Sequence, residues 1–264
     1  MQIYNQLQNM CLAAVIGGIL AASPLAAQTF GRTSISRPSV IDSPGSYVLV
    51  SDIALSANST ADAAIKITAS SVTVDLNGHQ ITGPGGLLGV GILIDGASSV
   101  TVRNGHIAYM FIGVRVAGSS NVKLNDLNIR GQDIGVSAPP PEIGVMIAQS
   151  RNVEVEDVNI SNVGLGVFVR GGMSGGNRIA NNTITGGDNG VFAICYNPTP
   201  DDPMGPSGDV ISGNLLSQFN VGINLVPTSG YNVIRDNTIA YKTAAWESPN
   251  DTNVFDGNVE RSLL

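Results

Sequence analysis

Charged side chains are scarce in this chain: 13 Lys and Arg and 20 Asp and Glu make up 12 % of its 264 residues, about half the share usual in soluble domains. This excludes a long amphipathic helical bundle. Lysine occurs only as Lys66, Lys123 and Lys242, and no basic run is present, which argues against nucleic acid as a partner. Aromatic residues are also few, at 5 %. In their place stand 32 glycines and short Val/Ile/Leu runs that alternate with Asn, Ser and Thr, a pattern that indicates an all-β protein.

The longest apolar stretch lies at residues 11–27, where it breaks at Ser23-Pro24 and ends in small residues. It is shorter than the roughly 20 residues that span a bilayer. We therefore expect 1–27 to be a signal peptide cleaved after Ala27, a secreted or periplasmic mature protein, and no membrane span after cleavage. Only two cysteines occur; Cys11 leaves with the signal, so Cys195 cannot form an intramolecular disulfide.

The remaining chain is repetitive. Residues 99–107 align without a gap with 121–129 and with 152–160. The shortest distance between equivalent positions, from Ile107 to Ile129, is 22 residues. A second short strand that opens with glycine follows several copies, at Gly113-Val114, Gly166-Val167, Gly190-Val191 and Gly222-Ile223. Such a copy cannot bury an apolar face alone, but like copies stacked at about 4.8 Å can. We predict an all-β, single-domain parallel β-solenoid of about eight coils.

Both ends of such a solenoid need covering, because unpaired strands invite aggregation. We assign residues 28–45 to an N-terminal cap, 46–260 to the solenoid and 261–264 to a C-terminal tail. Trp246, in Ala244-Ala245-Trp246, replaces the usual Gly-Val pair, and we expect it to plug the last coil.

Two segments, 41–49 (IDSPGSYVL) and 72–83 (VTVDLNGHQITG), give the chain a family likeness. Over about 40–260 it resembles the right-handed parallel β-helix proteins of the pectate-lyase-like superfamily. The resemblance implies a right-handed coil. It implies no single activity, since the superfamily includes polysaccharide lyases, hydrolases, epimerases, copper-processing accessory proteins and phage adhesins.

Equivalent positions of successive coils form columns, in which chemistry should be sought. Two outward columns of alternating charge, expected to form ion-pair ladders, comprise Lys123, Glu154 and Arg178, and Asp75, Arg103, Asn125 and Glu156. Asparagine also recurs at one corner of successive coils, which predicts a column of stacked amides made by Asn182, Asn214 and Asn237.

Two further pairs of residues each have a structural and a functional interpretation. Asp126 and Asp157 recur at one corner, where they stabilise a turn or bind Ca²⁺, the one cofactor that we consider. His79 and His106 follow Asn-Gly on adjacent coils. They cap turns or, stacked near Asp75, carry a proton or a metal.

The second strand predicts a groove. Its outward column contains the apolar row Met146, Phe168 and Phe192, bounded by Arg115 and Asn224, and insertions at 131–141 and 195–208 flank the row. The residues that we predict to bind a ligand are Arg115, Met146, Phe168, Phe192, Asn224, Arg170, Asp133 and Tyr196.

Beside a purely structural surface protein, whose proline-rich loops would cover the apolar row, two hypotheses about function stay open. The first is a secreted β-helix whose groove binds or processes a polysaccharide or oligosaccharide, including uronates, with Arg115 facing an acidic group. The second is a non-catalytic module whose groove binds a protein partner or another copy of itself. The sequence identifies no catalytic residues: of a polygalacturonase-like set only Asp201-Asp202 is present. Whether the protein is an enzyme is therefore left open.

Overall fold

The computed structural model describes residues 31–59, 61–85, 88–132, 142–187, 190–197 and 205–263. The chain divides into two units, Met1–Gly31 and Arg32–Leu264, and all strands belong to the second unit. The predicted signal peptide and the insertion segments 133–141 and 198–204 lie outside the described residues.

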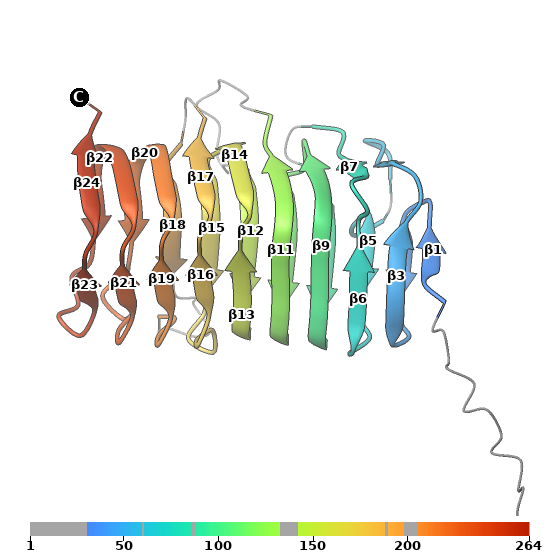
Figure 1. Cartoon of the computed structure of the whole chain (residues 1–264), viewed down its shortest axis with the longest axis horizontal. Coiled ribbons are helices and arrows are strands. Elements are labelled where there is room, and N and C mark those ends of the chain that lie inside the picture. Colours follow the sequence, from blue (N-terminus) through green and yellow to red (C-terminus); the bar gives the residue numbers. More distant parts are fainter. Residues whose placement is uncertain are drawn as a thin grey trace, which may run out of the picture. The chain divides into compact units, whose positions relative to one another are not determined.

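The strands of Arg32–Leu264 form three faces, and within each face a strand pairs in parallel with its equivalents in neighbouring coils (Figure 1). The first face contains β1 (Thr33–Ile35), β3 (Gly45–Leu49), β6 (Val72–Asp75), the first halves of β9 (Ser98–Ala108) and β11 (Ser120–Arg130), β13 (Arg151–Glu156), β16 (Arg178–Ala180), β19 (Val210–Ser212), β21 (Val233–Arg235) and β23 (Val254–Asp256).

The other two faces follow in each coil. The second face contains β4 (Ile53–Ala54), β7 (Gln80–Thr82), the second halves of β9 and β11, β14 (Asn159–Val163), β17 (Thr183–Gly186), the beginnings of β20 (Leu215–Asn224) and β22 (Thr238–Glu247), and β24 (Val259–Ser262). The third face contains β2 (Ser39–Ile41), β5 (Ile65–Ile67), β8 (Val90–Asp95), β10 (Ile112–Ala117), β12 (Ile143–Ala148), β15 (Leu165–Arg170), β18 (Phe192–Asn197) and the ends of β20 and β22.

The predicted parallel register is confirmed on the first face. Val122 pairs with Val100 and Val153, and Leu124 pairs with Val102. The six residues expected to face inward, which are Val100, Val102, Val122, Leu124, Val153 and Val155, are at most 1 % exposed. The unit is a right-handed parallel β-helix, as the resemblance implied.

The glycines that open the third-face strands are needed for close approach of the coils. A Cβ on Gly113 would lie 2.6 Å from the backbone oxygen of Gly144 and 2.6 Å from Cγ2 of Ile129. Gly144 meets the next coil in the same way, with the oxygen of Gly166 at 2.7 Å. At these two positions a Cβ would require one coil to shift, which favours the Gly-Val motif there.

The corner after the first face requires a left-handed backbone. Asn104, Asp126, Asp157 and Asn181 have φ of 61°, 53°, 54° and 56°. Asparagine and aspartate tolerate this conformation better than other residues with a side chain. This requirement is sufficient to explain why Asp126 and Asp157 recur in register.

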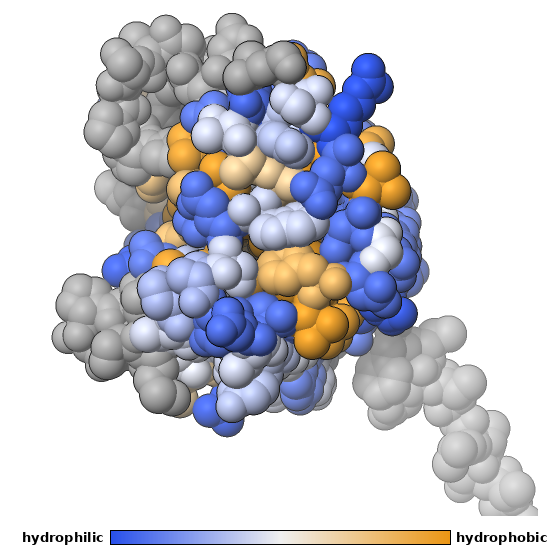
Figure 2. Space-filling view, turned by 90° about the vertical axis from the view of Figure 1, so that its left-hand side faces the viewer, coloured by the Kyte–Doolittle hydropathy of each residue, from blue (hydrophilic) through white to orange (hydrophobic). Residues whose placement is uncertain are grey.

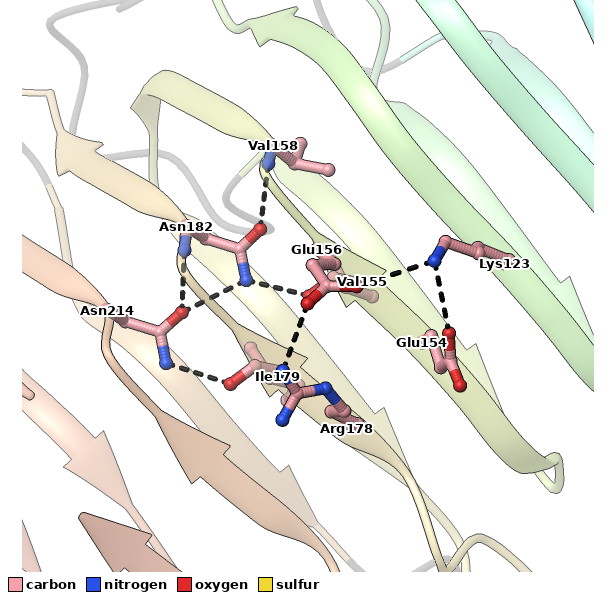
Figure 3. Close-up of polar contacts among 9 residues, drawn as sticks. All are labelled: Lys123, Glu154, Val155, Glu156, Val158, Arg178, Ile179, Asn182 and Asn214. Atoms are coloured by element: carbon pink, nitrogen blue, oxygen red, sulfur yellow. Dashed lines mark hydrogen bonds and ion pairs between the residues drawn. The ribbon is translucent and has the colours of Figure 1, made fainter. Parts of the chain in front are cut away.

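The predicted asparagine column is confirmed and lies inside the coil (Figure 3). Asn214 Oδ1 accepts from the backbone N–H and from Nδ2 of Asn182, at 2.9 and 3.0 Å. Its own Nδ2 donates to the Ile179 carbonyl at 2.9 Å and to Asn237 Oδ1 at 2.9 Å. The column extends by one coil to Asn258. A second column consists of the buried Asn177, Asp209 and Asn232 and the partly buried Asn253.

The first coil starts earlier than predicted. Residues 28–45, assigned to a cap, contain β1 and β2, which pair in parallel with β3 and β5. Arg32, Arg37 and Pro38 lie directly before these two strands and leave their pairing intact, and Ile35 and Ile41 face inward. At the other end β24 continues to Ser262, into the predicted tail.

Trp246 covers the core at the last third-face strand. It pairs with the inward residue Ile223, packs against the core, and stacks on Phe255 with ring centroids 4.8 Å apart. The plug predicted from the sequence is therefore confirmed. Figure 2 views the end where β22 and β24 lie, and apolar residues there stand among hydrophilic ones.

Replacing Asn214 with alanine tests the amide column. The change removes the acceptor of the Asn182 N–H and the donor to the Ile179 carbonyl, both inside the coil. Because each buried group left without a partner costs about 1–3 kcal/mol, we expect Asn214→Ala to lower the free energy of unfolding by roughly 2–4 kcal/mol. Chemical denaturation measures the loss. Asn128→Ala, at an exposed second-face position, is the control and should change it by less than about 0.5 kcal/mol.

Candidate functional site

The outward column of the third face runs through Leu93, Arg115, Met146 and Phe168 in adjacent strands. This part of the predicted column is confirmed. Beyond Phe168 the register brings Cys195 and then Asn224 into the column. Phe192 is not a member and pairs instead with Leu165 and Val221. The prediction failed because Gly190-Val191 imitates the Gly-Val motif, whereas Ala193-Ile194 occupies its position.

The predicted row of exposed apolar residues is also wrong in part, because it is largely covered. Leu93 and Met146 are only 8 % and 7 % exposed, while Phe168 is half-buried. Met146 belongs to a second hydrophobic cluster, separate from the coil interior, which we call the outer cluster. Its members are Ile112, Ile143 and Met146, with the partly buried Val90, Phe111, Ala148, Leu165 and Phe168 packed against them.

A pocket of about 250 Å³ adjoins the outer cluster and shares Val90 and Phe111 with it. Its walls are mostly apolar, with the hydroxyls of Ser56 and Ser59 and the carboxylate of Asp62 among them. The other lining residues are Leu55, Ala57, Ala61, Pro84, Leu88 and Gly89. Sequence reasoning missed this pocket. Phe111 directly precedes β10 and so lies outside the repeating strand, and residues 55–62 belong to no repeat.

Arg115 lies within the apolar part of the column, between Leu93 and Met146. Its Nε is buried and has no hydrogen-bond partner in the described part of the structure. A buried donor without a partner costs free energy. An acceptor supplied by a ligand would remove that cost.

The other predicted binding residues are dispersed. Arg170, at the end of β15, is two positions along from Phe168 and pairs with Asn197. Asn224 Nδ2 donates to Cys195 Sγ at 3.8 Å, and burial raises the pKa of the Cys195 thiol to about 12. Asp133 lies outside the described residues. Glu142 is buried and accepts the Gln132 N–H at 2.7 Å.

Tyr196 points into the coil instead of into a groove. It is fully buried and takes the position that Val169 occupies in the preceding coil. The strand β18 continues through Cys195 and Tyr196 to Asn197, so these residues are not part of the insertion as predicted. The Tyr196 hydroxyl donates to Asp209 Oδ2 at 2.8 Å.

Asp209 is the one acid in the second amide column, and it is buried. Its carboxylate accepts the backbone N–H of Asn177 at 2.7 Å as well as the Tyr196 hydroxyl. Burial raises the pKa of Asp209 to about 6, although these hydrogen bonds act in the opposite direction. Burial and the nearby Asp209 raise the pKa of Tyr196 as well.

The charged columns of the first face are confirmed as ion-pair ladders (Figure 3). Lys123 Nζ lies 3.6 Å from Glu154 and 3.4 Å from Glu156, and Arg178 lies 3.0 Å from Glu156. The hydrogen bond from Arg178 is the main cause of the lowered pKa of Glu156. These groups neutralise one another at the surface, so their role is structural and each pair contributes little stability.

The two histidines are not stacked, contrary to the functional interpretation. His106 pairs with Gln80, because the corner between Asp75 and Gln80 holds four residues where that between Arg103 and His106 holds two. His79 Nδ1 lies 3.1 Å from Asp52, and Asp75 instead binds Arg103 at 3.4 Å.

Fold and sequence together define the class: a right-handed parallel β-helix protein that carries its distinctive surface on the third face. Within this class the chain belongs to the NosD family, described as periplasmic copper-binding protein, whose model matches residues 64–259. The protein is accordingly secreted or periplasmic, as the sequence predicts. No helix among the described residues is long and apolar enough to cross a membrane. No curated protein matches the chain.

Several solved structures share the fold. The Dettilon tailspike protein matches with a TM-score of 0.60 and 15 % identity over 87 % of this chain and 54 % of its own. An alginate lyase from Paenibacillus has a TM-score of 0.53, 13 % identity, and 86 % and 92 % coverage. The periplasmic alginate epimerase AlgG matches with a TM-score of 0.55 and 12 % identity over 80 % of this chain and 53 % of its own. The chain thus spans about half the length of the tailspike and of the epimerase.

The described residues do not fit the copper ion that the family description implies. Copper prefers thiolate, thioether and imidazole ligands. The Cys195 thiol has a pKa of about 12 and stays protonated, and Met110 lies in the core. Across the described ranges no three His, Cys, Asp or Glu side chains come together as a metal site. We derive no chemistry from a metal.

The pH dependence of stability tests the buried acid. Because the folded-state pKa of Asp209 is raised to about 6 from an ordinary 3.8, its neutral form stabilises the fold at low pH. That contribution, on the order of 2–3 kcal/mol, is lost as the pH rises from about 4 through 6. Asp209→Asn removes the titration, so we expect it to be more stable than the unchanged protein at pH 8 and little different at pH 4.

Urea denaturation at pH 4, 6 and 8 measures the effect, and Asp251→Asn, at an exposed position, is the control. An Asp209→Asn protein whose stability differs from the original by the same amount at all three pH values would show that Asp209 titrates normally.

Proposed function

We propose that the outer cluster is a binding surface for a polysaccharide chain. The observation that supports this most directly is the position of Phe111 and Phe168, which lie partly exposed on an apolar base outside the coil. Their coils are two steps apart along the stack, with β12 between them, which is about 10 Å at 4.8 Å per step. The apolar faces of sugar rings pack well on such aromatic rings.

Polar groups beside the rings fit the same ligand. The hydroxyls of Ser56 and Ser59 and the carboxylate of Asp62 hydrogen-bond sugar hydroxyls, while Arg115 Nε lacks an acceptor that a carboxylate or a hydroxyl provides. Arg115 therefore favours an acidic polysaccharide such as a uronate. The names of two similar structures, an alginate lyase and an alginate epimerase, make alginate the first probe.

A protein partner is the competing occupant, because Phe, Met and Arg side chains also form the centres of protein interfaces. Binding to a second copy would appear in sedimentation as a concentration-dependent dimer that Phe168→Ala abolishes.

Truncation of the two rings tests the binding surface. Loss of such a contact typically costs 1–3 kcal/mol of affinity, so Phe111→Ala and Phe168→Ala should each weaken binding to alginate or dextran by about 10- to 100-fold in calorimetric titration. Tyr231→Ala removes an aromatic ring that is 75 % exposed elsewhere on the coil and should change nothing.

Both phenylalanine variants should keep the thermal midpoint within a few degrees, because the rings are partly exposed. A loss of about 3–5 kcal/mol, the value for a phenylalanine in a core, would show instead that the rings serve only stability.

Replacement of Arg115 by glutamine tests the acidic ligand. The variant keeps a hydrogen-bond donor but loses the charge, so binding to alginate should fall about tenfold while binding to neutral dextran stays the same. Arg235→Gln, at an exposed first-face position, removes the same charge elsewhere and controls for net charge. An equal loss of affinity for alginate and for dextran would show that Arg115 does not bind a carboxylate of the ligand.

A further inference from the structure

The pocket lies at one end of the outer cluster. Its described lining comes from three successive coils. Before β5 it includes Ser56, Ser59 and Asp62, at β8 it includes Pro84, Leu88, Gly89 and Val90, and before β10 it includes Phe111. The strands of the outer cluster continue from β10 through β12 to β15, which carries Phe168. The segment that precedes β5 is therefore on the side of the pocket away from Phe168.

The size of the pocket limits what it accepts. Its volume of about 250 Å³ is below the 300–1,000 Å³ of pockets that hold drug-sized molecules. One sugar ring is thus a better match than several. Leu55, Val90 and Phe111 supply apolar walls.

The polar side of the pocket is held in place. Lys66 Nζ binds the Asp62 carboxylate at 2.9 Å and lies 3.8 Å from Asp95. The contact with Asp62 is the main cause of the raised pKa of Lys66, so the lysine is charged and offsets the charge of Asp62. An ionised carboxylate only accepts hydrogen bonds, and sugar hydroxyls donate them.

We propose that this pocket holds the terminal sugar of a polysaccharide whose following residues lie along the outer cluster from Phe111 toward Phe168. The inference rests on the proposed function and adds to it that chain ends are recognised. Ser56, Ala57 and Asp62 of the segment before β5 line the pocket on the side away from Phe168, and in this proposal they stop the polymer there. A chain that enters the pocket ends there.

Partial depolymerisation of a polysaccharide separates binding of ends from binding of the interior. Alginate and dextran are each prepared at three mean chain lengths, and calorimetric titration gives the amount of protein bound per gram. Binding of ends predicts that this amount rises in proportion to the number of chain ends. Binding of the interior predicts a constant amount per gram.

A variant that fills the pocket completes the test. Ala57→Trp places a large side chain at an exposed lining residue, and we expect it to abolish the dependence on chain ends. Ala54→Trp, at an exposed position of β4 that does not line the pocket, is the matched control and should keep that dependence.

The outcomes are distinguishable. A constant amount of protein per gram at every chain length, or an end dependence that survives in Ala57→Trp, overturns the terminal-sugar pocket and leaves the proposed binding surface standing. No binding of alginate or dextran at any length rejects both.

Discussion

The parallel hydrogen bonds between successive coils are the interaction on which the rest of this structure depends. No coil is long enough to enclose an apolar interior by itself, so each is stable only against its neighbours, at a spacing of about 4.8 Å. This spacing places every residue directly over its equivalent, as Val100, Val122 and Val153 show. A substitution therefore affects the packing of the equivalent residues above and below it. The sequence is repetitive because these stacked residues must fit one another.

The corners show how strict this requirement is for polar groups. A backbone that turns inside the stack leaves N–H and C=O groups without a strand partner, and buried groups of this kind must be satisfied. Asn182, Asn214 and Asn237 do so with amides that both donate and accept. The ionised carboxylate of Asp209 can only accept hydrogen bonds, and the Tyr196 hydroxyl donates one to it. The large tyrosine inside a column of aliphatic residues is thereby explained.

The sequence predicts what the stacking repeats and fails where the repeat is interrupted. The inward valines, the ion-pair ladders and the Asn214 column could be derived because their spacing is fixed by pairing. Phe192 was misplaced since Gly190-Val191 matches the motif in letters but not in register. His79 and His106 were misaligned because one corner holds two more residues than the other.

Burial outside the coil could not be predicted either. Alternation places Met146 outward, and its side chain does leave the coil, but alternation does not show that a second cluster covers it. The pocket depends on residues 55–62, which no repeat constrains. Features built from non-repeating segments carry no periodic signal, so they become visible only in three dimensions.

The separation of the outer cluster from the core bears on function. The interior cluster runs from Ile35 to Ala245 without Met146, Ile112 or Ile143, so the coil is closed without them. Ile112, Ile143 and Met146 are themselves covered, but Phe111 and Phe168 stay partly exposed outside the closed coil, and exposed apolar area in water carries a cost. Their presence beside a pocket with three polar side chains is explained if this face meets a ligand. The stack beneath then serves as a rigid base that holds Phe111 and Phe168 in fixed positions, which reduces the entropy lost on binding.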